Sequence, residues 1–265
     1  MADTSDDIAC PRHDRALLLH GTKRNDVLTL AEVRQYGTDS FRDPDYVRIY
    51  GATPSQWYAR GVRLLGRTAV ECTRDELGDR IGRDIADVAA QMLPTPDCIV
   101  IDPFAGSCNT LFWILRHLPN ARALAFELDA QVCKLTEGNL ALLDTSILLH
   151  HGDYQSLLPE STLTPDTSMV AFIAPPWGQA LDEAKGLDLS RTNPPITEII
   201  RFFDRTFPAR RLLFAVQVYE KLEPASLAEV QALLDWSELR VYALNSAGKN
   251  HGLLLGTKGW PQRAF

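Results

Sequence analysis

From residue 98 onward, the sequence alternates short apolar runs with stretches of helical periodicity. The apolar runs are residues 98–101, 123–126, 147–149, 169–173 and 212–218, followed by a closing pair at 239–244 and 253–255. Helical stretches at 111–118, 129–143, 196–203 and 226–236 lie between them. Strands that are buried on both faces read as continuous apolar runs. The alternation therefore predicts an α/β fold with a mostly parallel seven-stranded sheet and helices on both faces.

The first 95 residues do not follow this alternation. Residues up to about Asp43 are polar and irregular, so we expect a mobile arm with one short helix. Further on, Thr53-Pro54-Ser55 and the capping sequence Thr73-Arg74-Asp75-Glu76 each predict the start of a helix. We therefore divide the chain into an N-terminal arm with a helical accessory region, 1–95, and a ligand-binding domain, 96–265.

Composition narrows the classes of function. The chain carries 34 acidic and 27 basic side chains, a formal net charge of −7, and an acidic protein attracts long nucleic acid poorly. It has no apolar run of about 18 residues and no apolar leader, so we expect a cytoplasmic protein without a membrane span or secretory signal. The five cysteines form no CxxC pair, so we expect neither a disulfide framework nor a metal site. The oligomeric state stays open.

The stretch richest in chemistry follows the first apolar run. That run ends in Asp102, and the small-residue turn Pro103-Phe104-Ala105-Gly106-Ser107 leads into a helix near Thr110. Ligands of doubly wound sheets bind at the carboxyl ends of the strands, and small residues let a ligand approach the backbone. A carboxylate here favours a cationic ligand over a pyrophosphate, such as the ammonium and sulfonium region of S-adenosylmethionine (SAM).

Two more acids follow the next two apolar runs. Glu127 lies about 20 to 25 residues further on, where an acid can accept both ribose hydroxyls of an adenosine group. Asp153 follows the third run and can accept from an adenine amino group. Each acid alone is explained equally well as a turn or helix-start residue. Their common order after consecutive strands predicts a single nucleoside-binding edge.

The sequence Ala174-Pro175-Pro176-Trp177-Gly178 follows the fourth apolar run. The two prolines hold the backbone extended, which leaves the carbonyls of Ala174 and Pro175 free to accept hydrogen bonds. Trp177 can stack on a flat substrate ring. If the ligand is SAM, the reaction is transfer of its methyl group, and the rate depends mostly on how the accepting nucleophile is positioned against that group. We therefore predict that Ala174, Pro175 and Trp177 orient the nucleophile of the substrate. The alternative is a strand end that only packs.

These motifs resemble a known group of enzymes. Asp-Pro-Phe-Ala-Gly-Ser is similar to the SAM-binding motif of amino-group DNA and RNA methyltransferases. The Pro-Pro-Trp-Gly sequence after the fourth apolar run looks most like the RNA cap guanine-N2 methyltransferases, the trimethylguanosine synthase group. The resemblance covers about residues 56–178 and implies a Rossmann-like class I methyltransferase with SAM as cofactor. It implies that the cofactor contacts the first motif and the residues that end or follow the next two strands. These residues are Asp102, Pro103, Phe104, Ala105, Gly106, Asn109 and Thr110 in the first motif, Glu127 and Leu128 after the second strand, and Asp153 and Tyr154 after the third.

The resemblance also implies that Pro175, Pro176 and Trp177 hold the substrate. Upstream, Tyr50 and Trp57 can either line an aromatic lid over the substrate, together with Tyr46 and Tyr58, or pack an accessory helix. We count Tyr50 and Trp57 as candidate substrate-binding residues.

Two departures from the group bear on the substrate. The group usually has Asp, Asn or Ser at the place of Ala174, so amine methylation would rest on backbone carbonyls or on a residue from elsewhere. Cys108 stands where the first motif usually has its second glycine. We predict N-methylation of a small heteroaromatic or nucleotide-like substrate. Two alternatives stay open: a small-molecule N-, O- or C-methyltransferase of specialised metabolism, and a catalytically silent SAM-fold subunit that supports a partner or binds RNA.

Overall fold

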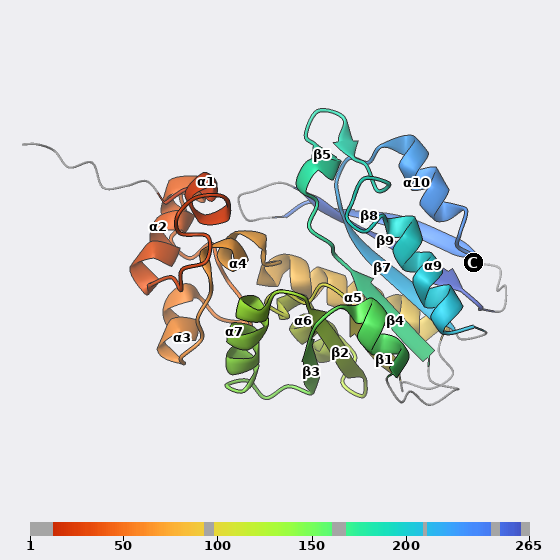
Figure 1. The fold of residues 1–265 in the computed structure, drawn as a ribbon, viewed down its shortest axis with the longest axis horizontal. Coiled ribbons are helices and arrows are strands. Elements are labelled where there is room, and N and C mark those ends of the chain that lie inside the picture. Colours follow the sequence, from red (N-terminus) through yellow and green to blue (C-terminus); the bar gives the residue numbers. More distant parts are fainter. Residues whose placement is uncertain (1–12, 93–97, 161–167, 209–210, 245–249, 261–265) are drawn as a thin grey trace, which may run out of the picture.

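The computed structural model describes residues 13–92, 98–160, 168–208, 211–244 and 250–260. Its centre is a seven-stranded sheet in the order β3-β2-β1-β4-β7-β9-β8 (Figure 1). The strands are β1 (Cys98–Asp102), β2 (Arg122–Glu127), β3 (Ile147–His151), β4 (Ser168–Ile173), β7 (Leu212–Tyr219), β8 (Trp236–Tyr242) and β9 (His251–Lys258). The first five strands of this order run parallel, and β9 is antiparallel to both of its neighbours. The predicted mostly parallel, seven-stranded α/β sheet is confirmed.

Successive side chains of the buried strands point to opposite faces of the sheet and belong to two separate hydrophobic cores. Both faces are therefore apolar, and helices cover each of them. The first core lies under α5 (Asp75–Met92), α6 (Asn109–His117) and α7 (Ala130–Leu140). The second lies under α8 (Tyr154–Leu157), α9 (Ile196–Thr206) and α10 (Pro224–Gln231). After β4 come the short elements η2 (Gly178–Ala180), β5 (Leu181–Asp182) and β6 (Gly186–Leu187), and η1 (Leu158–Glu160) follows α8. Helix α5 thus packs on the sheet, although it precedes the predicted boundary at residue 95.

Local capping explains where the helices begin. Asp129 is the N-cap of α7, and its carboxylate accepts from the backbone N–H groups of Gln131 and Val132. The predicted helix at 226–236 was wrong at both ends. Helix α10 begins at Pro224 because Glu223 is its N-cap, and strand β8 already starts at Trp236.

For residues 13–43, the expectation of an irregular arm was also wrong. From residue 13 on, the N-terminal region forms α1 (Arg15–Leu19), α2 (Leu30–Phe41), α3 (Pro54–Ala59) and α4 (Gly66–Glu71). These helices lie together at one end of the molecule, far from α9 and α10 (Figure 1). They enclose a third hydrophobic core that includes Val33, Tyr36 and Trp57. The N-terminal region therefore has a packed interior of its own.

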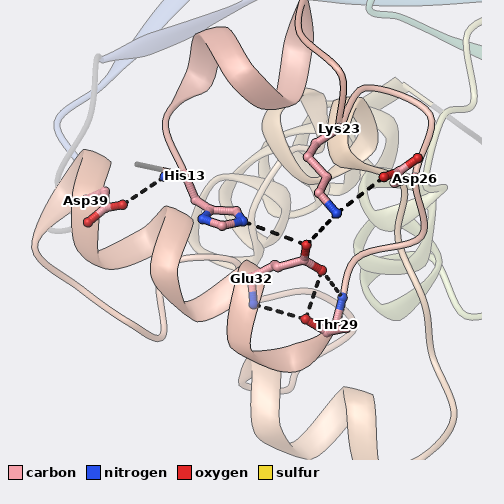
Figure 2. Close-up of polar contacts among 6 residues, drawn as sticks. All are labelled: His13, Lys23, Asp26, Thr29, Glu32 and Asp39. Carbon is pink, nitrogen blue, oxygen red and sulfur yellow. Dashed lines mark hydrogen bonds and ion pairs between the residues drawn. The ribbon is translucent and has the colours of Figure 1, made fainter. Parts of the chain in front are cut away.

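Glu32 is the centre of the polar contacts that shape this region (Figure 2). Its carboxylate accepts from the backbone N–H and the hydroxyl of Thr29, both at 2.8 Å, which completes a capping box at the start of α2. The same carboxylate pairs with Lys23 at 2.8 Å and lies 3.7 Å from His13. Partial burial opposes ionisation, but the hydrogen bonds from Lys23 and Thr29 prevail and lower the pKa of Glu32 to about 2. This ionised carboxylate joins the loop after α1 to α2.

The structure also bears on the expected absence of a membrane span and of disulfides. None of the helices in the described ranges is both long enough and apolar enough to cross a membrane. Cys72, Cys108 and Cys133 are free thiols. Cys10 and the acidic start of the chain lie outside the described residues.

Candidate functional site

The three predicted acids lie at the carboxyl ends of three neighbouring parallel strands, β1, β2 and β3. Asp102 pairs in register with Ala125, and Glu127 lies two residues further along the same strand. Alternation along β1 and β2 therefore places the Asp102 and Glu127 side chains on the same face of the sheet, the face that α5 and α6 cover. Asp153 follows β3 as the N-cap of α8, where its carboxylate accepts from Gln155 N–H at 3.0 Å.

The loop between β1 and α6 is tied to the neighbouring strand. The backbone N–H of Ala105 donates to the carbonyl of Phe126 at 2.9 Å, and that of Gly106 donates to Glu127 Oε2 at 3.0 Å. The Thr136 hydroxyl donates to the Gly106 carbonyl at 2.7 Å. Gly106 has φ 49°, a left-handed conformation that glycine adopts without strain. These contacts hold the turn after β1 against the carboxyl end of β2 and against α7.

Glu127 both supports this turn and keeps acceptor capacity for a ligand. Its Oε2 accepts from Gly106 N–H at 3.0 Å, and its Oε1 accepts from Asp129 N–H at 2.8 Å. A carboxylate offers about four lone-pair sites, so about two remain. Because the backbone fixes both oxygens, Glu127 can accept two neighbouring hydroxyls without first being ordered.

Asp102 is buried, with 2% of its surface exposed. Burial raises the pKa of its carboxyl most strongly, a hydrogen bond from Phe104 N–H opposes the rise, and the nearby charge of Glu127 adds to it, so that the resulting pKa is about 7. A buried carboxylate is costly unless a cation or donors compensate its charge. The position therefore suits a ligand that brings a positive group to the end of β1.

The other predicted cofactor residues divide into exposed and buried ones. Leu128 is 73% exposed beside Glu127, where it can cover an apolar ring. Tyr154 is buried, and its ring lies 5.6 Å from that of Phe104 and 5.2 Å from that of Phe202. Pro103, Ala105 and Thr110 are buried within the turn and the start of α6. Of this set, Leu128 has the largest exposed surface to offer.

Asn109 has a different environment from the one the resemblance implies. Its Oδ1 accepts from Tyr50 N–H at 2.7 Å, and its Nδ2 donates to the Thr73 carbonyl at 2.7 Å and to Asp75 Oδ1 at 3.2 Å. Both the oxygen and the nitrogen of the Asn109 amide are thus hydrogen-bonded to residues that precede the sheet in the chain. Asn109 therefore fastens the start of α6 to the preceding chain.

The segment after β4 presents Trp177 at the same edge of the sheet. Ala174 and Trp177 are half-buried, Pro175 is buried and Pro176 is exposed. The Trp177 ring lies 6.2 Å from Tyr219 and 5.4 Å from His251, measured between ring centroids. The sequence pattern did not identify Tyr219 and His251 as neighbours of Trp177. Tyr219 directly follows the apolar run 212–218, and His251 lies just before the run 253–255. The antiparallel register that pairs them supplies the missing information.

Tyr50 and Trp57 lie in the core of the N-terminal region. Trp57 is 1% exposed and its Nε1 donates to the Val47 carbonyl at 2.9 Å. Tyr50 is 4% exposed and its hydroxyl donates to the Ser107 carbonyl. Of the two alternatives for these rings, the structure shows packing, and we leave both out of the substrate site.

Known proteins resemble this chain in fold and not in sequence. No family model and no curated protein matches it. Three solved structures resemble it: a proposed class I SAM-dependent methyltransferase of Listeria monocytogenes (18% identity, 68% of this chain and 59% of that chain, TM-score 0.48), the N-terminal domain of human METTL16 (14%, 67% and 67%, 0.48), and a probable spermidine synthase of Corynebacterium glutamicum (14%, 74% and 68%, 0.46). This chain thus spans less than two thirds of the Listeria protein. Such likeness concerns the fold alone, and we argue function from the site.

Proposed function

We propose that the protein is a SAM-dependent methyltransferase. The observation that carries the proposal is Glu127, whose two oxygens are fixed by backbone N–H groups and which shares a sheet face with the buried Asp102. Adenosine hydroxyls and an ammonium group match these two acids. In this arrangement Glu127 holds the ribose, Asp102 faces the ammonium group, and Leu128 and Asp153 bound the adenine.

Bound SAM supplies an electrophilic methyl group, and the protein contributes the placement of the acceptor. The segment from Ala174 to Trp177 begins at the end of β4, which pairs directly with β1 and so lies beside Asp102. We assign the Ala174 and Pro175 carbonyls to orient an acceptor amine, since the Ala174 side chain has no polar atom. Holding the acceptor in line with the methyl group is the main source of rate in such a displacement.

For the acceptor we propose a flat heteroaromatic nitrogen compound. Trp177 supports this proposal, because Tyr219 and His251 brace its ring while part of its surface stays exposed. A flat ring stacked on an indole gains binding energy without a sequence-specific hydrogen bond. The cap guanine of RNA and free small heteroaromatics both belong to this class.

The test begins with the cofactor. Calorimetry with SAM and with its demethylated product should show binding to the wild type, and Glu127→Ala should lose it, whereas Glu137→Ala, an exposed acid on α7, should not. Equal affinity of Glu127→Ala and the wild type would contradict the proposed cofactor site.

The second step identifies the acceptor. Transfer of a labelled methyl group to capped RNA, to free nucleosides and to a panel of small heteroaromatics separates a cap-type enzyme from one of small-molecule metabolism. Cofactor binding without transfer to any acceptor would favour the silent-subunit alternative.

A further inference from the structure

The cofactor loop of the proposed site, residues 103–108, is supported on a second side by the N-terminal region. Tyr50 provides the contact: its hydroxyl donates to the Ser107 carbonyl, and its backbone N–H donates to Asn109 Oδ1 at 2.7 Å. Its ring lies edge-on to Phe112 of α6, with 5.7 Å between centroids. Tyr50 thus contacts the loop and the first turns of α6 at once.

A carboxylate fixes Tyr50 in this place. Asp75 Oδ2 accepts from the N–H of Gly51, the residue after Tyr50, at 3.0 Å. Asp75 Oδ1 accepts from Trp113 Nε1 at 2.7 Å and from Asn109 Nδ2 at 3.2 Å. Asp75 therefore joins the start of α5, the turn at residues 50–51 and helix α6.

The loop needs such support because its backbone is in an unfavourable conformation. Within the loop, Cys108 has φ 56°, in the left-handed region that residues other than glycine rarely adopt. Ser107 is 5% exposed, so its carbonyl depends on the Tyr50 hydroxyl rather than on bulk water. Glu127 of β2 and Thr136 of α7, which follow the loop in the chain, hold it through Gly106. Tyr50, which precedes the loop in the chain, holds it through Ser107.

A second contact reaches the other part of the rim. Arg67, the second residue of α4, pairs with Asp129 at 2.7 Å, and the N–H of Asp129 donates to Glu127. The side chain of Arg67 is 11% exposed and that of Asp129 is 40% exposed, so the guanidinium is held in the protein while solvent still reaches the carboxylate. The N-terminal region thus contacts both the loop after β1 and the turn after β2.

We propose that Tyr50 is a positioning residue of the cofactor site, and that the N-terminal region, through Tyr50 and Asp75, sets the conformation of residues 103–108. This inference rests on the proposed function for the identity of the ligand. It does not require Tyr50 to touch cofactor or substrate. It makes cofactor affinity depend on Tyr50, which lies more than 50 positions before the cofactor loop in the chain, and on Asp75, which holds the turn that carries Tyr50.

The test compares Tyr50→Phe with Tyr36→Phe in the full chain. Both tyrosines are at most 4% exposed and belong to the same hydrophobic core, and each variant loses one hydroxyl. Tyr50→Phe should raise the dissociation constant for the demethylated product of SAM roughly tenfold, the effect of one buried hydrogen bond. Tyr36→Phe should leave that constant unchanged.

Hydrogen exchange of the cofactor-free protein provides a readout that a loss of stability alone does not move. Amides 104–109 should exchange faster in Tyr50→Phe than in Tyr36→Phe at equal global stability. Asp75→Asn leaves one oxygen to accept from three donors, Gly51 N–H, Trp113 Nε1 and Asn109 Nδ2, so at least one of these hydrogen bonds is lost. This variant should act in the same direction and replaces Tyr50→Phe if that variant does not fold. Equal exchange of these amides and equal affinity in the Tyr50 and Tyr36 variants would overturn the inference. If the wild type binds no cofactor, the proposed function fails while the exchange experiment still decides the coupling.

Discussion

Replacing Asp102 by Asn should stabilise the fold at alkaline pH and weaken cofactor binding at the same time. The carboxyl of Asp102 is buried, and burial raises its pKa from 3.8 to about 7. An asparagine keeps an oxygen that can accept from Phe104 N–H and carries no charge.

The sign and size of the effect on stability follow from linkage. Folding raises the pKa of Asp102, so its contribution is fully present below pH 3.8 and is lost as the pH rises through about 7. Between pH 5 and pH 8 the loss amounts to about 3 kcal/mol, at 1.36 kcal/mol for each pH unit below the folded pKa. The uncharged Asn variant has no such term. The stability of wild type minus variant should therefore fall by about 3 kcal/mol over this range.

Urea unfolding at several values between pH 5 and pH 8 measures this difference, with Glu137→Gln as the exposed control that should follow the wild type. Calorimetry measures the affinity for SAM, which should change with pH in the direction opposite to the stability of the fold. Only the ionised Asp102 can pair with an ammonium group, so wild-type affinity for SAM should rise about tenfold from pH 6 to pH 8. The Asn variant should bind more weakly at pH 8 and lack that component of the pH dependence.

Two results would refute this reasoning. A stability difference that stays constant from pH 5 to pH 8 would mean that Asp102 does not titrate there. Unchanged SAM affinity of the Asn variant at pH 8 would mean that no cationic group of the ligand faces this carboxylate.

Substitutions at three other positions test separate parts of the molecule. Glu127→Ala should weaken SAM binding more than tenfold and speed exchange of the Gly106 amide, and protection of that amide at the wild-type level would contradict its role in the loop. Trp177→Ala should lower the rate of methyl transfer about tenfold or more without changing SAM affinity, and Trp177→Phe should recover part of it; an unaffected rate would remove Trp177 from the acceptor site. Glu32→Ala should cost about 1 kcal/mol and a few degrees of melting temperature by breaking the Thr29 capping box. Because the pKa of Glu32 is lowered to about 2, the difference from wild type should persist at neutral pH and shrink as the pH falls from about 4.5 toward 2, and a difference independent of pH would count against the ion pair.

Local patterns in the sequence were sufficient for the sheet and its acidic edge. Each apolar run of β1, β2 and β3 is followed by its acid at the point where the strand ends, so Asp102, Glu127 and Asp153 could be placed from strand order alone. Asp129 could be identified as a helix cap because capping depends on residues within one turn. The same kind of signal, Thr29 followed three residues later by Glu32, was present before α2 and was overlooked.

Tertiary structure decided which side chains of the first motif are available to a ligand. Asn109 belongs to the motif by position, yet Tyr50, Thr73 and Asp75 occupy its amide. Trp177 acquires its neighbours Tyr219 and His251 only when β7 and β9 pair antiparallel. Short-range periodicity records how each segment folds, whereas these contacts join segments far apart in the chain, and their geometry exists only once the sheet has brought those segments together.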